Sequence, residues 1–375
     1  MAWYGAVNAL FQGWKLAAIA CLAVLFFATH REGFRFRVNE FFGLYLFWII
    51  YILNCFRYGN SAGDILNNAL TSFVLLNLIA YASTRPWREP FLRALSWIFV
   101  AYLLLQCASM VVIHSGHVLF EPIPGDYTYF LGTDNYSAFA VYPMLGVVLF
   151  CDARRNPAGT LSRKSWLLSV AVVVSFLYVR SMTAALAGMV LLLALLLRDY
   201  WGFWLKLLNI RTVLCVALAV FLLIHYGHIQ LVFSSLLEGV LHKGVTLNSR
   251  TIIWENAVNL IKQKPLLGFG ALSQKQIDNY VLYGTTHAHN LFLELLLRTG
   301  IVGTAGYLVF LAGFARTFPR RGLSRRPVSI LLIFLIVQVV LFSMDFYATI
   351  QYFYCFMGML YYGGAMEAAE KEVTP

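Results

Sequence analysis

Residues Ser165–Leu197 read SWLLSVAVVVSFLYVRSMTAALAGMVLLLALLL, two apolar runs that meet at Arg180 and contain no other charged residue. Apolar runs of roughly 17 to 23 residues recur along the chain, which is the length that a helix needs to cross a bilayer. Of the 375 residues, 60% are hydrophobic and only 12% are charged, whereas about a quarter are charged in soluble domains. The sequence therefore predicts an all-α, polytopic integral membrane protein.

The whole chain reads as one membrane domain with about eleven spans. We place them near residues 14–29, 40–56, 65–81, 91–113, 136–151, 165–179, 183–197, 212–225, 291–315, 327–342 and 347–362. No cleavable signal peptide is expected at the start of the chain. The six cysteines occur singly, in or next to these spans, so we expect them to serve helix packing.

The net charge of +11 follows the predicted topology. Cations gather in alternate short loops, which the positive-inside rule assigns to the cytoplasm, and this distribution argues against a nucleic-acid partner. These cations are Arg31, Arg35, Arg37, Arg85, Arg88, Arg93, Arg154, Arg155, Arg163, Lys164, Arg198, Lys206, Arg211, Arg316, Arg320, Arg321, Arg325 and Arg326. The loops between them then face outward, including the turn at Arg180 and a long loop over residues 226–288. We therefore expect the site on the extracytoplasmic face of the membrane, where any synthetic reaction must draw its energy from the substrate.

Two outward arginines are candidates for binding a phosphate. Arg180 lies on the outer face against the positive-inside trend, and its planar guanidinium suits two oxygens of a phosphate. The alternative is an arginine that only snorkels to the membrane boundary. Arg250 begins the stretch Thr251–Lys262, which has the pattern of an amphipathic helix at the membrane interface, with Trp254 as its anchor. Free amides of a first helical turn favour an anion, although Arg250 can also be simply solvated.

The turn and the histidines that follow complete the outward set. Pro265 ends the predicted helix, and we expect a tight, mobile turn at Leu267–Gly270. His287 and His289 have the spacing of metal ligands, but no nearby carboxylate has a recognisable metal spacing, so no metal is expected. A histidine at a helix start is instead a candidate general base, and for His287 a structural role is the stronger alternative. Two arginines that neutralise a departing diphosphate, with a histidine that takes a proton from an attacking hydroxyl, would favour transfer over hydrolysis.

At these residues the chain resembles the O-antigen ligase/polymerase superfamily. The matching pieces are Val179-Arg180-Ser181, Ser249-Arg250 with Trp254, Pro265-Leu266-Leu267-Gly268-Phe269-Gly270, His289-Asn290-Leu291-Phe292-Leu293-Glu294 and Arg298-Thr299-Gly300-Ile301-Val302-Gly303, with Gly132-Thr133-Asp134-Asn135 upstream. The resemblance, strongest in its ligase branch, implies a metal-independent membrane glycosyltransferase that has about a dozen spans and no cofactor. It places Arg180 and Arg250 on the donor diphosphate and makes His289 the base. Within or beside the same motifs, Trp254, His287, Asn290 and Asn135 are assigned to substrate binding.

The implied reaction is en bloc transfer of a polysaccharide from undecaprenyl diphosphate to a hydroxyl of the lipid A core, with inversion at the anomeric carbon. The resemblance also implies a multi-pass protein of the bacterial inner membrane, with its active site on the periplasmic face. The expected partners are therefore this lipid-linked donor, the lipid A core acceptor and membrane lipids. A polymerase, in which the acceptor is a second lipid-linked repeat, and a protein glycosyltransferase would use the same three residues. A transporter of lipid-linked substrates is the alternative from another class, but transporters tend to show inverted repeats, and we find no repeat in the sequence.

Overall fold

The computed structural model describes residues 38–58, 62–83, 88–114, 128–156, 158–200, 210–226, 250–285, 287–313, 327–344 and 352–361. Within these ranges the protein is helical apart from turns and a hairpin of two-residue strands, β1 (Thr128–Tyr129) and β2 (Gly132–Thr133). Four helices are long and apolar enough to cross a membrane, namely α2 (Val38–Tyr58), α4 (Arg88–His114), α5 (Asp134–Arg155) and α13 (Leu291–Gly313). The protein is an all-α, polytopic membrane protein, as predicted.

The remaining helices are shorter or less apolar. They are α3 (Ala62–Ser83), α6 (Arg163–Tyr178), α7 (Met182–Leu196), α9 (Ile210–His225), α11 (Arg250–Ile261), α12 (Gln274–Tyr280), α14 (Val328–Met344) and a helix over residues 352–361. Each predicted span from 40–56 onward falls on one of the described helices. The predicted span at 14–29 lies outside the described residues.

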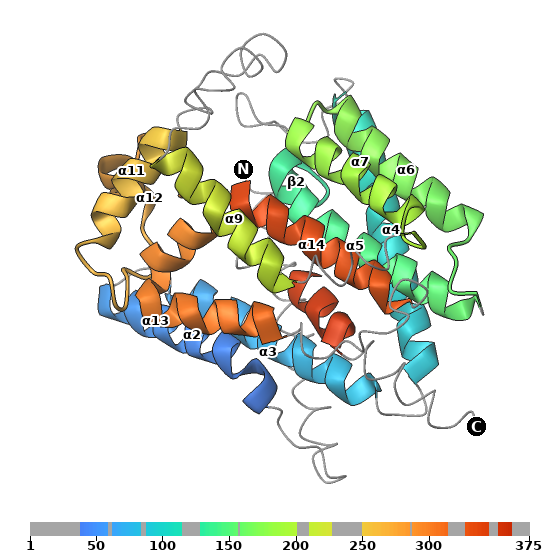
Figure 1. Cartoon of the computed structure of the whole chain (residues 1–375), viewed down its shortest axis with the longest axis horizontal. Helices are drawn as coiled ribbons and strands as arrows, with labels where there is room; N and C mark the ends of the chain where they lie inside the picture. Colours follow the sequence, from blue (N-terminus) through green and yellow to red (C-terminus); the bar gives the residue numbers. More distant parts are fainter. Residues whose placement is uncertain are drawn as a thin grey trace, which may run out of the picture.

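Helix α5 lies among α4, α6, α7 and α14 (Figure 1). It packs against these four helices, and most of its residues from Tyr136 onward are buried inside the protein. Both faces of this helix are apolar, which is the pattern expected of a helix that is surrounded by other helices. The predicted site residues on α5 and at the α6–α7 turn are therefore attached to the core of the molecule.

Helices α2 and α13 pack side by side through glycine (Figure 1). A Cβ atom on Gly43 would overlap the carbonyl of Gly306, and one on Gly306 would lie 2.7 Å from the carbonyl of Gly43. Small residues allow such close backbone contact between membrane helices, where packing rather than the hydrophobic effect holds helices together. The segment over residues 265–270 contacts both helices of this pair.

The two ends of the part of the bundle that α4, α5, α6 and α7 form make different contacts. At one end, Arg154 of α5 forms an ion pair of 2.9 Å with Glu89 of α4, and Arg198 donates to the carbonyl of Gly159 at 2.7 Å. At the opposite end, the rings of His114 and Tyr178 lie 5.2 Å apart, next to the β1–β2 hairpin. Basic residues at or just beyond the ends of α5 and α7 thus lie at the same end of the bundle.

Candidate functional site

The first half of the site is a break in helix α13, at Gly300. This glycine has φ 60° and ψ −165°, which interrupts the helical hydrogen bonds that Ile301 and Val302 would make to Leu297 and Arg298. The segment Pro265–Gly270 forms four backbone hydrogen bonds with the groups that the break leaves free. They are Phe269 N–H to Leu297 C=O (2.7 Å), Gly270 N–H to Arg298 C=O (2.9 Å), Ile301 N–H to Pro265 C=O (2.8 Å) and Val302 N–H to Leu266 C=O (3.2 Å). All four groups freed by the break therefore gain a partner, which apolar surroundings require.

These hydrogen bonds bring the 265–270 segment so close to α13 that both require glycine. Gly268 and Gly270 have φ of 73° and 75°, and a Cβ on Gly268 would lie 2.7 Å from backbone atoms of α13. A Cβ on Gly300 would overlap the backbone of Leu266 and Leu267. The side-chain amide of Asn54, on α2, also donates to the carbonyls of Leu267 and Arg298. The expectation of a mobile turn here is wrong, because hydrogen bonds to two helices hold the segment.

The second half of the site is the segment from Val281 to Asn290, which α11 and α12 hold in place. The indole of Trp254 donates to the carbonyl of Ala288 at 3.1 Å, and the amide of Asn256 donates to Val281 at 2.7 Å. From α12, Gln274 donates to the carbonyl of Thr285 at 2.7 Å. Trp254 is only 1% exposed, so it anchors α11 to the histidine segment rather than to the membrane interface. That part of the sequence interpretation is wrong.

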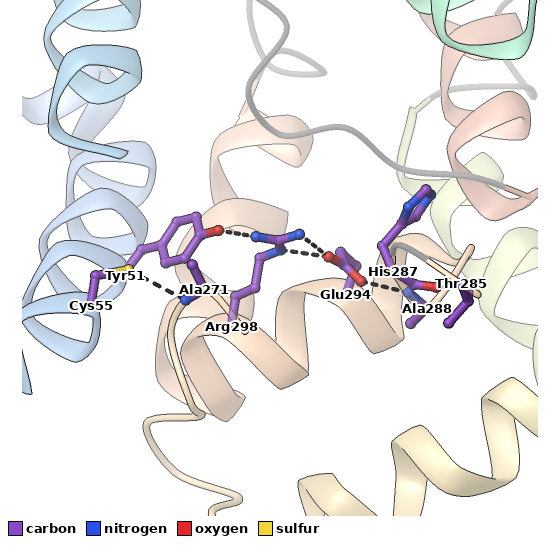
Figure 2. A network of polar contacts seen from close by, with 8 residues as sticks. All are labelled: Tyr51, Cys55, Ala271, Thr285, His287, Ala288, Glu294 and Arg298. Atoms are coloured by element: carbon purple, nitrogen blue, oxygen red, sulfur yellow. Dashed lines mark hydrogen bonds and ion pairs between the residues drawn. The ribbon is translucent and has the colours of Figure 1, made fainter. Parts of the chain in front are cut away.

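A chain of polar contacts links this segment to α2 (Figure 2). The Glu294 carboxylate, which is buried, accepts from the backbone N–H of Ala288 at 2.9 Å and from Arg298 Nε at 2.6 Å. The same guanidinium donates to the hydroxyl of Tyr51 on α2. A buried pair of charges requires this kind of additional hydrogen bonding. The amide between the two histidines is thereby tied, through one carboxylate, to a rigid pair of membrane helices.

His289 has an unusual backbone conformation, with φ 50°. Its Nε2 lies 3.2 Å from the hydroxyl of Thr285, and its ring centroid is 4.0 Å from that of His287. The next residue, Asn290, is fully buried and caps α13, because its Oδ1 accepts from the N–H groups of Phe292 and Leu293 at 2.9 and 3.2 Å. Asn290 thus fixes the start of the helix immediately after the candidate base.

Arg180 has the other left-handed backbone, with φ 59°. Helix α6 ends in a Schellman motif, in which Arg180 N–H bonds Leu177 C=O at 3.1 Å and Ser181 N–H bonds Phe176 C=O at 3.0 Å. The position that Arg180 occupies in this motif is usually a glycine. Among the described residues, Arg180 and His289 are the non-glycine residues with positive φ. Such strain persists at functional sites when the surrounding structure holds it.

The structure brings some of the predicted residues together. Arg250 opens α11, one turn before Trp254 and on the same face of the helix, so it lies on the side of α11 that contacts Ala288. Trp254 bonds the carbonyl of Ala288, which lies between His287 and His289, and Asn290 follows His289 directly, so these four residues lie close together. Arg180 is exposed, and in the part of the chain that the structure describes no contact connects it to this group. Asn135 lies in the first turn of α5, but its side chain falls outside the described part.

Three residues that the sequence did not single out support the site, namely Tyr51, Asn54 and Thr285. Arg298, which belongs to one of the matching pieces but had no expected role, supports it as well. The spacing of Glu294 and Arg298, four positions apart on a helix, is a signal for an ion pair. Tyr51 and Asn54 lie more than two hundred positions before their partners, Arg298 and Leu267. No local pattern in the sequence reveals such contacts.

Residues 156–308 match the family model described as O-Antigen ligase. This match covers less than half of the chain, and it includes Arg180, α11, the spliced segment and the histidines. No match was found among curated proteins or among solved structures. The match supports an O-antigen ligase/polymerase type of function, a glycosyltransferase-like enzyme in a multi-pass membrane protein.

Proposed function

We propose that this protein is an O-antigen ligase, which transfers a polysaccharide from undecaprenyl diphosphate to a hydroxyl of the lipid A core on the periplasmic face of the inner membrane. One observation carries the proposal. The two non-glycine residues with left-handed backbone among the described residues, Arg180 and His289, are two of the three that the expected chemistry requires. Both lie within the matched residues 156–308.

In this proposal His289 is the general base. The acceptor hydroxyl gives its proton to the imidazole, its oxygen forms a bond to the anomeric carbon, and the bond from that carbon to the diphosphate oxygen breaks. A histidine in such a role contributes about 10²- to 10⁴-fold to the rate. The single displacement predicts inversion at the anomeric carbon. Trp254 and the Glu294–Arg298 pair hold the segment that carries the base, so the ring is positioned before the acceptor arrives.

Arg180 and Arg250 stabilise the leaving group in the same proposal. Charge accumulates on the diphosphate as the glycosidic bond breaks, and guanidinium groups neutralise it with paired, charge-assisted hydrogen bonds. Arg250 reaches the diphosphate from the first turn of α11, where the amide groups that lack helical partners also point toward an anion. No metal and no cofactor is assigned a step. His287 and Asn135 are assigned to substrate contacts.

The test is a reconstitution of purified protein in lipid nanodiscs with undecaprenyl-diphosphate-linked glycan and EDTA. Parallel reactions contain lipid A core or a second lipid-linked repeat as acceptor. A lipid A core band shifted by the glycan, absent in His289→Ala and present in His114→Ala, is the expected result. Growing ladders on the lipid carrier would instead assign a polymerase. Transfer to neither acceptor, or full transfer by His289→Ala, would overturn the proposal.

A further inference from the structure

The hydroxyl of Thr285 makes two contacts that restrict where protons lie in the site. Its Oγ1 is 3.2 Å from the carbonyl oxygen of His287 and 3.2 Å from Nε2 of His289. A threonine hydroxyl has one proton to donate, whereas a carbonyl oxygen can only accept. Both contacts are hydrogen bonds in a single arrangement, in which Thr285 donates to His287 and accepts from His289.

That arrangement determines the tautomer of His289. If Thr285 Oγ1 accepts, Nε2 of His289 must carry the proton, and a neutral imidazole then has its lone pair on Nδ1. The opposite tautomer would leave two acceptors facing one donor, so one of them would lose its hydrogen bond. Thr285 is buried, with 7% of its surface exposed, where an unmade hydrogen bond costs about 1–3 kcal/mol.

Thr285 is itself held by groups other than its hydroxyl. Gln274 of α12 donates to its carbonyl at 2.7 Å, and its N–H donates to the carbonyl of Leu282 at 3.2 Å. Helix α12 is fixed by a capping box at Ser273 and Gln276. The backbone of Thr285 therefore stays in place when the side chain is changed, which makes the hydroxyl separable from the fold.

We propose that Thr285 is a positioning residue that holds His289 in the Nε2–H tautomer, so that Nδ1 is the atom that takes the proton of the acceptor hydroxyl. This inference rests on the proposed function for its consequence in turnover, although the tautomer can be tested without it. The acceptor proton moves to Nδ1, and Nε2–H keeps its hydrogen bond to Thr285 in the imidazolium. The acceptor oxygen bonds to the anomeric carbon, and the diphosphate leaves with the electron pair of the broken bond.

The experiment is ring ¹⁵N NMR of histidine-labelled full-length protein in nanodiscs, at a pH where the ring is neutral. The His289 signals are identified by their loss in His289→Asn. We expect the Nε2–H tautomer in the wild type and in Thr285→Ser, and a mixture of tautomers in Thr285→Val. Turnover in Thr285→Val should fall about 10- to 100-fold, as for other groups that orient a functional histidine. Thr285→Ser should restore it, and binding of undecaprenyl diphosphate alone should be unchanged in both variants.

The tautomer of His289 and the proposed glycan transfer can be refuted independently. An Nδ1–H tautomer in the wild type would overturn the assignment of Thr285, whatever the enzyme transfers. An unaltered tautomer together with full turnover in Thr285→Val would overturn it as well. A wild-type Nε2–H tautomer that Thr285→Val loses would support it, even if no glycan were transferred to either acceptor, and that last result would count against the proposed function alone.

Discussion

The turn at Arg180 and the segment at His289 share one feature and differ in what holds it. Each contains a non-glycine residue with a left-handed backbone. Around His289, the backbone is bound by the Trp254 indole of α11, by an amide of α12 and by the buried Glu294 carboxylate of α13. Around Arg180, the backbone hydrogen bonds that end α6 define the turn, and the side chain is exposed.

The difference fits the two roles that we propose for these residues. A general base must be held in one geometry before the acceptor binds, because a small displacement is enough to slow proton transfer. An arginine that binds a diphosphate can reach its ligand through a flexible side chain, provided that the backbone points the side chain to the correct side. In this proposal the left-handed backbone at Arg180 sets the direction of the side chain, and the bound diphosphate fixes the final position of the guanidinium. Substitutions at the two positions can separate these roles.

The largest effect is expected from His289→Asn. Asparagine tolerates the left-handed region better than most residues do, so this variant removes the base and preserves the backbone. Glycan transfer should fall about 10²- to 10⁴-fold, while the affinity for undecaprenyl diphosphate stays within about twofold of the wild-type value. Initial rates and lipid binding by the purified variant check this. A variant that transfers glycan at the wild-type rate would show that His289 is not the base.

A comparable effect, on stability, is expected from Glu294→Gln. This change leaves the Arg298 guanidinium without its carboxylate in a buried site and weakens the acceptor of the Ala288 amide. Removing one partner of a buried ion pair costs about 3–5 kcal/mol, which a lower apparent unfolding temperature in nanodiscs would report. Combining Glu294→Gln with Arg298→Met should recover part of the loss. If the single variant unfolds at the wild-type temperature, the polar chain in Figure 2 does not stabilise the segment.

A smaller effect is expected from Arg180→Lys and Arg250→Lys. Each keeps the charge but loses the fork that binds two phosphate oxygens. A charge-assisted hydrogen bond contributes about 1.5–3 kcal/mol, so turnover should fall about 10- to 100-fold, and EDTA should not change it. Arg163→Lys, at the opposite end of α6, is the matched control and should leave turnover unchanged. Full activity in both Arg180→Lys and Arg250→Lys would count against the assignment to the diphosphate.

The sequence predicts the class of fold well because transmembrane helices are encoded locally. Continuous apolar runs determine where a helix crosses a bilayer, and each predicted span from 40–56 onward falls on a described helix. The same local logic places the start of α11 at Arg250 and identifies the glycines of the 265–270 segment. These are properties of neighbouring residues, and they survive without knowledge of the rest of the chain.

The contacts that hold the site are not local, and the sequence reading missed them for that reason. The partner of Arg298 on α2 is 247 positions away, and that of Leu267 is Asn54 on the same helix. The glycine-rich segment looks like a mobile turn when its helix partner is unknown, although four backbone hydrogen bonds join it to a broken helix. Trp254 reads as an interfacial anchor because an indole suits both a membrane surface and a buried carbonyl.

The smallest effect tests the strain at Arg180 directly. Arg180→Gly and Arg180→Ala both remove the guanidinium and should both lose turnover, but only glycine adopts φ 59° without steric cost. A left-handed residue with a side chain costs roughly 1–2 kcal/mol, and the larger entropy of glycine in the unfolded chain offsets about 0.5–1 kcal/mol of this gain. Arg180→Gly should therefore be more stable than Arg180→Ala by about 0.5–1 kcal/mol, measured as a higher apparent unfolding temperature. Equal stability of the two variants would mean that the turn relaxes when the side chain is shortened. The left-handed backbone at position 180 would then carry no steric strain.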